Sequence, residues 1–188
     1  PAGQRLTANR TIESFYKWSG GGRIPIFCDT TSCTHTLLFE TGGDILTPEN
    51  REKYKQLKIM DITQWLKEVV LPRIKVIRPK NRILLHPTCS CQIMGLTPVL
   101  LDIARKCARE VILPDNWGCC GASGDRGFIF PELSDSATRD ERDEIGHESF
   151  DGCYSLARTC EIAMQDHIEQ PYESIVYLVD ETIQDQGT

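Results

Sequence analysis

The residues of this chain best suited to chemistry are two adjacent cysteines, Cys119 and Cys120, in the glycine-rich run 118–127. Glycine lacks a Cβ and readily adopts positive φ, so N–H groups in such a run can turn toward an anion. Thiolates hold iron–sulfur clusters, which are anions of this kind. Gly121 and Gly124 are therefore predicted to let the backbone approach a bound cluster. The alternative is a tight turn with two buried cysteines, because free cysteine is often simply buried.

The cysteine content points to a reducing compartment. The chain has nine cysteines in 188 residues and no evident secretory signal. Without a secretory context, cysteines bind metals or act in redox chemistry more often than they form structural disulfides. We therefore expect a cytoplasmic protein, with peripheral association at the inner membrane as a second option. A net charge of −6 argues against a nucleic-acid partner, and no apolar run reaches the length of a membrane span.

The elements that must position these cysteines are predicted to alternate between strands and helices. Short apolar runs bounded by turn residues predict strands at 24–28, 59–62, 82–86, 110–113 and 154–157. Apolar residues at three- and four-residue spacings predict an amphipathic helix from Leu96 to Ala108, with Cys107 in its core face. Alternation of this kind predicts an α/β fold, with a mostly parallel sheet flanked by helices.

Cysteines follow several of the predicted strands. The residues concerned, in chain order, are Cys33, Cys89, the pair Cys119 and Cys120, and Cys160. In an open α/β sheet, ligands bind beyond the carboxyl ends of the strands. These five thiols are therefore candidate metal ligands, predicted to converge on one rim of the sheet.

Other polar residues could support such a site. His86 ends a predicted strand near Cys89, and it could be a ligand, hydrogen-bond a sulfur, or fix the loop through a backbone contact. Arg126 and Arg158 could offset the charge of a cluster, or form surface salt bridges. The acidic run 140–144 is predicted to be the solvated face of a helix.

Three segments of the chain together resemble a known family. They are His86-Pro87-Thr88-Cys89-Ser90, then Gly118-Cys119-Cys120-Gly121 with Gly124-Asp125-Arg126-Gly127-Phe128 and Pro131-Glu132-Leu133, and finally Ser155 with Arg158-Thr159-Cys160-Glu161. From about Ile24 onward, the chain is similar to the cysteine-rich CCG domain of heterodisulfide reductases and of glycolate oxidase iron–sulfur proteins. The resemblance is closer to the C-terminal part of fused FAD-binding, iron–sulfur D-2-hydroxyacid dehydrogenases of the D-lactate or D-2-hydroxyglutarate type.

This resemblance implies an iron–sulfur electron-transfer module of an oxidoreductase. It implies one 4Fe–4S cluster, with the ligands Cys89, Cys119, Cys120 and Cys160, and with Cys33 as an additional candidate. Electrons would pass from reduced FAD toward a quinone or another acceptor. The FAD would belong to a part of the protein outside this chain, with flavin and ferredoxin-like domains as partners, so the chain alone would not be catalytic. A structural zinc-binding domain and a thiol–disulfide redox protein are the alternatives.

The chain departs from the family pattern in two places. That pattern closes with Cys-x-x-Cys, whereas Ala157 stands three residues before Cys160. The segment before residue 82 also lacks its own Cys-Cys-Gly. One cluster is therefore expected rather than two.

The domain organisation is predicted from the same segments. Residues 1–23 are predicted to be a linker or irregular N-terminal segment, since the opening resembles a piece cut from a longer polypeptide. Residues 24–188 are predicted to form the cysteine-rich domain. A faint repeat of residues 27–33 in residues 85–91 divides that domain into weak half-units, 24–81 and 82–188.

Overall fold

Two parallel sheets organise the chain, and each belongs to a separate unit. The computed structural model describes residues 2–183, and the chain divides into the units Pro1–Ile62 and Thr63–Thr188. The predicted fold class is confirmed, because helices flank parallel sheets of two and four strands. Among the described residues, no helix is both long enough and apolar enough to cross a bilayer.

The N-terminal unit is built on a parallel pair of strands, in which Phe27 is aligned with Met60. Its elements are α1 (Ala2–Trp18), β1 (Ile26–Cys28), α2 (Thr31–His35), the π-helix η1 (Thr36–Glu40), the 3₁₀ turn η2 (Gly43–Ile45), α3 (Pro48–Gln56) and β2 (Ile59–Asp61). The helix α3 begins with Pro48 in its first turn, and the Thr47 hydroxyl accepts a hydrogen bond from the Asn50 N–H at 3.3 Å.

The prediction of an irregular segment over residues 1–23 is wrong, because α1 is a helix of 17 residues. Hydrophobic periodicity gave no sign of it, since Ile12 is the buried residue of this helix. Polar contacts dock α1 instead. The Asn50 side chain of α3 donates hydrogen bonds to the side chains of Asn9 and Glu13, each at 2.9 Å.

The C-terminal unit contains a four-stranded parallel sheet with the order β4-β3-β5-β6. Its first elements are α4 (Ile62–Trp65), which begins at the unit boundary, the π-helix η3 (Leu66–Val70), the 3₁₀ turn η4 (Leu71–Arg73), β3 (Lys80–Leu85), α5 (Cys89–Ile93), α6 (Thr97–Cys107) and β4 (Ala108–Ile112). The elements that follow are α7 (Arg126–Ile129), α8 (Pro131–Ile145), β5 (Gly152–Ser155), α9 (Arg158–Ile168), β6 (Tyr172–Ser174) and α10 (Ile175–Thr182).

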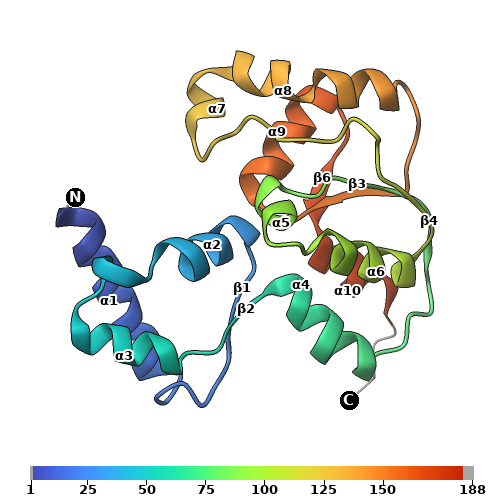
Figure 1. Ribbon diagram of the computed structural model, residues 1–188. Coiled ribbons are helices and arrows are strands. Elements are labelled where there is room, and N and C mark those ends of the chain that lie inside the picture. The colour runs from blue at the N-terminus through green and yellow to red at the C-terminus, as the bar shows by residue number, and fades with distance from the viewer. Residues whose placement is uncertain (1, 184–188) are drawn as a thin grey trace. The chain divides into compact units, whose positions relative to one another are not determined.

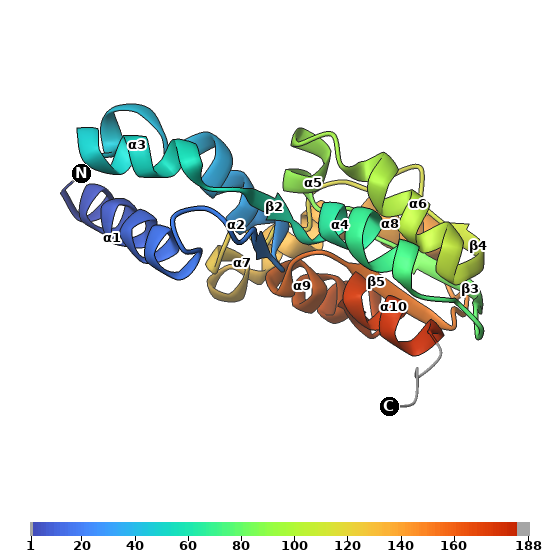
Figure 2. The same cartoon turned by 90° about the horizontal axis from the view of Figure 1, so that it is seen from below.

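Helices cover both faces of this sheet. In Figure 1, α8 and α9 lie on one side of the strands, and α6 and α10 lie on the other. Figure 2, seen from below, shows α6 and α10 in front of the strands. The apolar period predicted for α6 is confirmed, because Leu100, Ile103, Ala104 and Cys107 form its buried face. The strand β3 is central and carries the fully buried residues 83–85.

The boundary between the units differs from the predicted division at 81/82. It falls between Ile62 and Thr63. The helical segment that follows joins the C-terminal unit because η3 packs against α6. An antiparallel bridge from Val76 to Ile183 ties the connector before β3 to the end of α10.

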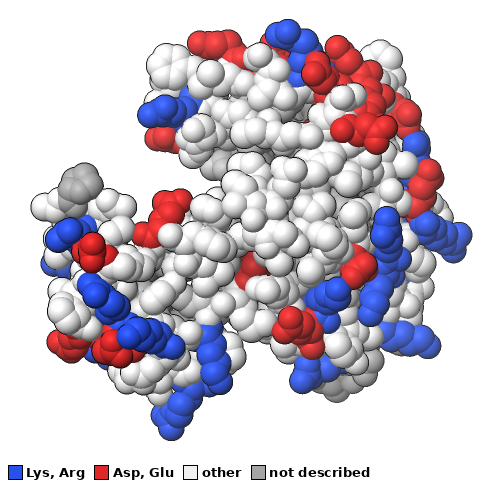
Figure 3. All heavy atoms as spheres, in the orientation of Figure 1, with Lys and Arg blue, Asp and Glu red and all other residues white. Residues whose placement is uncertain are grey.

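Charged side chains are distributed unevenly over the C-terminal unit. In Figure 3, acidic side chains gather over α8 at the upper right of the view. This helix carries an excess of acidic residues in its sequence, PELSDSATRDERDEI. Its exposed surface is therefore negative, which agrees in sign with the net charge of the whole chain.

Candidate functional site

Three loops at the carboxyl end of the second sheet bring the cysteines together. Cys89 follows β3 as the first residue of α5, Cys119 and Cys120 lie in the loop after β4, and Cys160 lies in the first turn of α9 after β5. The sheet order places β3 between β4 and β5. The three loops therefore start from neighbouring strands, and parallel strands present their carboxyl ends at the same edge.

The sulfur atoms of these four residues form a continuous chain of contacts. Cys119 is hydrogen-bonded to both Cys89 and Cys120. The Sγ atom of Cys120 lies 2.8 Å from the Sγ atom of Cys160. The charge of Cys160 also acts on Cys89, at the other end of the chain of contacts. We call these four side chains the thiol cluster.

The thiol cluster is buried on one side and open on the other. Cys120 is 3% exposed and Cys160 is 7% exposed, whereas Cys89 and Cys119 are exposed to solvent. An object bound by these sulfurs would have a protein-covered side and a solvent-facing side.

One thiol of the cluster is favoured as a thiolate. Hydrogen bonds from Cys120 and from Cys89 lower the pKa of Cys119 well below its usual range, and the N–H of Gly121 contributes to the same effect. This N–H donates to the Cys119 Sγ atom at 3.4 Å. The same contacts with Cys119 are the main cause that raises the pKa of Cys89 and of Cys120. Among these three sulfurs, the Cys119 sulfur is therefore the one that the contacts favour as a thiolate.

The two predicted glycines, Gly121 and Gly124, differ in the space that a side chain would have at each position. Both have positive φ, +73° at Gly121 and +76° at Gly124. A Cβ on Gly121 would lie 2.6 Å from the carbonyl oxygen of Leu133 and 2.7 Å from the Cα atom of Ser134, at the start of α8. A Cβ on Gly124 would meet nothing within 4 Å. Gly121 is therefore needed for close helix packing as well as for turning its N–H toward sulfur.

His86 lies directly after β3, and its ring contacts a side chain. One of the sequence alternatives, a backbone contact of the ring, is therefore wrong. Its Nδ1 atom is 2.9 Å from Oε2 and 3.2 Å from Oε1 of Glu141. Glu141 is 2% exposed, so the prediction that the run 140–144 is a solvated helix face is wrong at this position. Sequence reasoning missed Glu141, although the buried positions Ser134, Thr138, Glu141 and Ile145 follow a helical period.

The predicted arginines do not reach the sulfurs through any described contact. The Arg158 side chain is 72% exposed and pairs with Glu161 of the same helix at 3.0 Å, so it forms a salt bridge. The Arg126 side chain is exposed and has no ion pair within residues 2–183, including the predicted alternatives Asp125 and Glu132.

Cys33 belongs to the N-terminal unit, so it is described by itself. It is exposed on α2, close to Cys28. Burial is the main cause that raises the pKa of Cys28, and the charge of Cys33 adds to it.

The remaining cysteines have packing roles. Cys107 and Cys91 are fully buried, and burial raises the pKa of Cys153 to about 12. All nine cysteines lie in the described part of the chain, and none of them forms a disulfide.

The thiol cluster is not arranged around a single point. Within residues 2–183, no group of three or more His, Cys, Asp or Glu side chains is positioned to hold one metal ion. The sulfurs instead form a row of pairwise contacts. Cys89 contacts Cys119, Cys119 contacts Cys120, and Cys120 contacts Cys160. The arrangement therefore presents four soft donors side by side, and does not favour a single-ion site.

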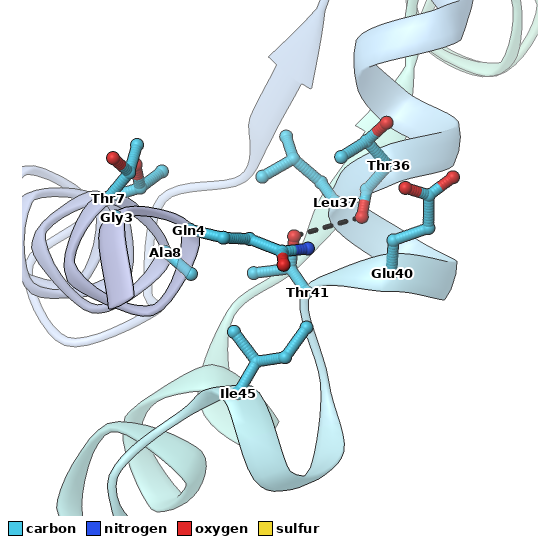
Figure 4. A pocket seen from close by; sticks show the side chains of 10 residues that line it. Gly3, Gln4, Thr7, Ala8, Thr36, Leu37, Glu40, Thr41 and Ile45 are labelled. Carbon is cyan, nitrogen blue, oxygen red and sulfur yellow. Dashed lines mark hydrogen bonds between the residues drawn. The ribbon is translucent and has the colours of Figure 1, made fainter. Parts of the chain in front are cut away.

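A pocket in the N-terminal unit offers less chemistry than the thiol cluster. It has a volume of about 360 Å³ and lies between α1 and η1 (Figure 4). Threonines line much of it, and the Thr41 hydroxyl donates to the Thr36 carbonyl at 2.9 Å. Glu40 is the one ionisable residue among the lining residues, and no thiol or imidazole joins it. We therefore place the candidate site at the thiol cluster.

The comparisons with known proteins add no identification to this geometry. No protein-family model matches the chain, and no curated protein matches it either.

Proposed function

We propose that this chain is an iron–sulfur electron-transfer module, with Cys89, Cys119, Cys120 and Cys160 as the ligands of one cluster. The observation that carries the proposal is the contact chain of these four sulfurs at one edge of the sheet. A 4Fe–4S cluster takes four thiolates, which is the number gathered here. When bound, such a cluster supplies one-electron transfer.

The side chains present fit this group in three respects. Cys119 is already favoured as a thiolate, and a thiolate is the form that binds metal. The N–H of Gly121 points at the Cys119 sulfur, and hydrogen bonds to sulfur tune cluster potentials. Cys120 and Cys160 are buried while Cys89 and Cys119 are exposed. The protein would therefore shield one side of the site and leave the other within reach of a redox partner.

The resemblance of the three cysteine-bearing segments extends this proposal to a larger enzyme. We propose that the module accepts electrons from reduced FAD in a flavin-dependent D-2-hydroxyacid dehydrogenase and passes them to a quinone or another acceptor. Flavin and ferredoxin-like domains would be its partners. We also propose a cytoplasmic location, with peripheral association at the inner membrane as an option, because metal-binding cysteines suit a reducing compartment. Cys33 stays a prediction as an additional ligand.

One observation favours a second candidate function. The sulfurs of Cys120 and Cys160, 2.8 Å apart, need only a small approach to reach the 2.03–2.05 Å typical of a disulfide. A thiol–disulfide redox protein would use this pair. A structural zinc domain that uses the same four cysteines stays an untested alternative.

The test is the visible spectrum of the chain purified without oxygen. We expect a brown protein with broad absorption that bleaches with dithionite. Cys120→Ala should abolish this absorption. Cys107→Ala is the matched control, because Cys107 is also a buried cysteine but lies on α6, outside the thiol cluster. A colourless wild-type protein would contradict the proposal. One zinc per chain would then favour the zinc domain, and no metal would favour the thiol–disulfide function.

A further inference from the structure

A buried histidine–carboxylate pair joins the end of β3 to α8, and ligand binding by the four cysteines does not account for it. His86 is fully buried, and Glu141 is 2% exposed. The Nδ1 atom of His86 and the Oε2 atom of Glu141 are 2.9 Å apart, although the two residues are 55 positions apart in sequence. Burial of an ionisable pair is costly unless each polar atom is satisfied, so the arrangement calls for a reason.

His86 is fixed at several points. Its backbone N–H donates to the Tyr154 carbonyl at 2.9 Å, and its carbonyl accepts from the Ser155 hydroxyl at 2.8 Å. The ring is held through its Nδ1 atom by the carboxylate of Glu141 in α8. Backbone and ring are therefore both anchored, and the orientation of Nε2 follows from the fold rather than from a free rotamer.

The Nε2 atom is buried and has no hydrogen-bond partner among residues 2–183. The Tyr172 ring lies edge-on to the imidazole, with a centroid distance of 6.5 Å, but its hydroxyl is likewise buried and unpartnered. The two orphan groups therefore do not satisfy each other. A buried polar atom without a partner costs about 1–3 kcal/mol, and such atoms in native proteins commonly face a bound group.

The burial of the pair indicates whether Nε2 carries a hydrogen. A buried pair with a net charge is more costly than a neutral pair. In the neutral pair, one proton is shared between Nδ1 and the carboxylate. Nε2 then carries a hydrogen whichever partner holds the shared proton. Nε2 is therefore a buried hydrogen-bond donor without an acceptor among residues 2–183.

The acceptor is indicated by the surroundings. His86 directly follows β3 and stands three residues before Cys89, at the end of the sheet from which the three cysteine-bearing loops start. The imidazole is therefore carried at the same edge of the sheet as the four sulfurs. Anionic sulfur accepts hydrogen bonds, and those bonds stabilise the more reduced state of an iron–sulfur centre.

We propose that the Nε2–H group of His86 donates a hydrogen bond to a sulfur of the metal centre, and that Glu141 holds the ring and its hydrogen in place. This inference rests on the proposed function, because it needs a centre at the thiol cluster. His86 then raises the reduction potential of that centre, and it is not one of its ligands.

The first test is the midpoint potential of the centre in His86→Gln, measured by EPR during a redox titration. We expect the equilibrium constant for reduction to fall about tenfold, which is a shift of ~59 mV toward negative potential for a one-electron couple. Glu141→Gln should shift the potential in the same direction, because the amide carbonyl accepts from Nδ1–H and leaves Nε2 without its hydrogen. His147→Gln is the control, since His147 is exposed beyond the end of α8.

A second measurement on the wild-type chain covers the case in which the variants fold poorly. With ¹⁵N-labelled histidine, pulsed EPR of the reduced centre should show a weak nitrogen coupling. His147→Gln should retain this coupling.

The outcomes separate the two proposals. Wild-type protein without iron and sulfide would contradict the proposed function, and this inference with it. A centre that forms but shows no nitrogen coupling and an unchanged potential in His86→Gln would overturn only the inference, leaving the pair as a structural anchor. A strong coupling of a directly bound nitrogen would also overturn it, because His86 would then be a ligand.

Discussion

The sulfur atoms of Cys120 and Cys160 lie 2.8 Å apart, although 40 positions separate the two residues in the sequence. Their loops follow β4 and β5, which are not neighbours in the sheet, because β3 lies between them. The contact therefore closes over the end of β3, where Cys89 begins α5. This closure turns cysteines from three separate loops into one site.

Without metal, Cys120 and Cys160 should form the first disulfide of the chain. We expect mild oxidation with diamide to remove two electrons and two protons from this pair, because its sulfurs are already close. Peptide mapping by mass spectrometry should find the two residues linked. Cys107 should stay reduced because it is buried in the core face of α6, outside the thiol cluster. Preferential formation of a different disulfide would contradict the described geometry.

Alkylation of Cys119 should depend weakly on pH. An ordinary thiol has a pKa of about 8.5, so its reaction rate with iodoacetamide falls about tenfold for each pH unit below that value. Hydrogen bonds from Cys120 and Cys89 lower the pKa of Cys119, so its thiolate persists as the pH falls. We expect its rate in the folded, metal-free chain to stay nearly constant from about pH 8 to about pH 6.

The control for this prediction is the same chain in denaturant, where the hydrogen bonds are absent. Every thiol should then lose reactivity by about tenfold per pH unit. If folded Cys119 showed the same steep loss, its pKa would not be lowered by the contacts with Cys120 and Cys89.

Gly121 and Gly124 form a matched pair for testing what the glycine-rich loop requires. Both adopt positive φ, so alanine at either position costs about 1–2 kcal/mol of folding free energy. Gly121→Ala should lose about 1–3 kcal/mol more. Its Cβ would lie 2.6 Å from the Leu133 carbonyl oxygen. Urea unfolding of the metal-free variants measures the difference, and equal losses would show that α8 does not pack on this loop as described.

Strands β1 to β5 and the cysteine-bearing loops could be predicted from the sequence, whereas β6 (Tyr172–Ser174) was missed. Strand β3 is an apolar run that ends at a proline-containing turn, and α6 shows a regular apolar stripe. Both signals are local, since they depend on residues near one another in the chain. The convergence of loops at one edge followed from the parallel arrangement of the strands.

Two features could not be predicted because their causes are not local. Glu141 lies in an acidic run typical of a solvated helix, and its burial depends on a histidine 55 positions away. Helix α1 carries almost no apolar stripe, and its docking depends on Asn50, 41 positions from Asn9. In both cases, a specific polar contact between distant residues overrides the local pattern.

The iron and acid-labile sulfide content of the chain, purified without oxygen, tests the central claim most directly. The account predicts iron and sulfide in comparable amounts in the wild type and in Cys107→Ala, and loss of both in Cys120→Ala and Cys160→Ala. A wild-type chain that contains one zinc and no sulfide, or no metal at all, would contradict it.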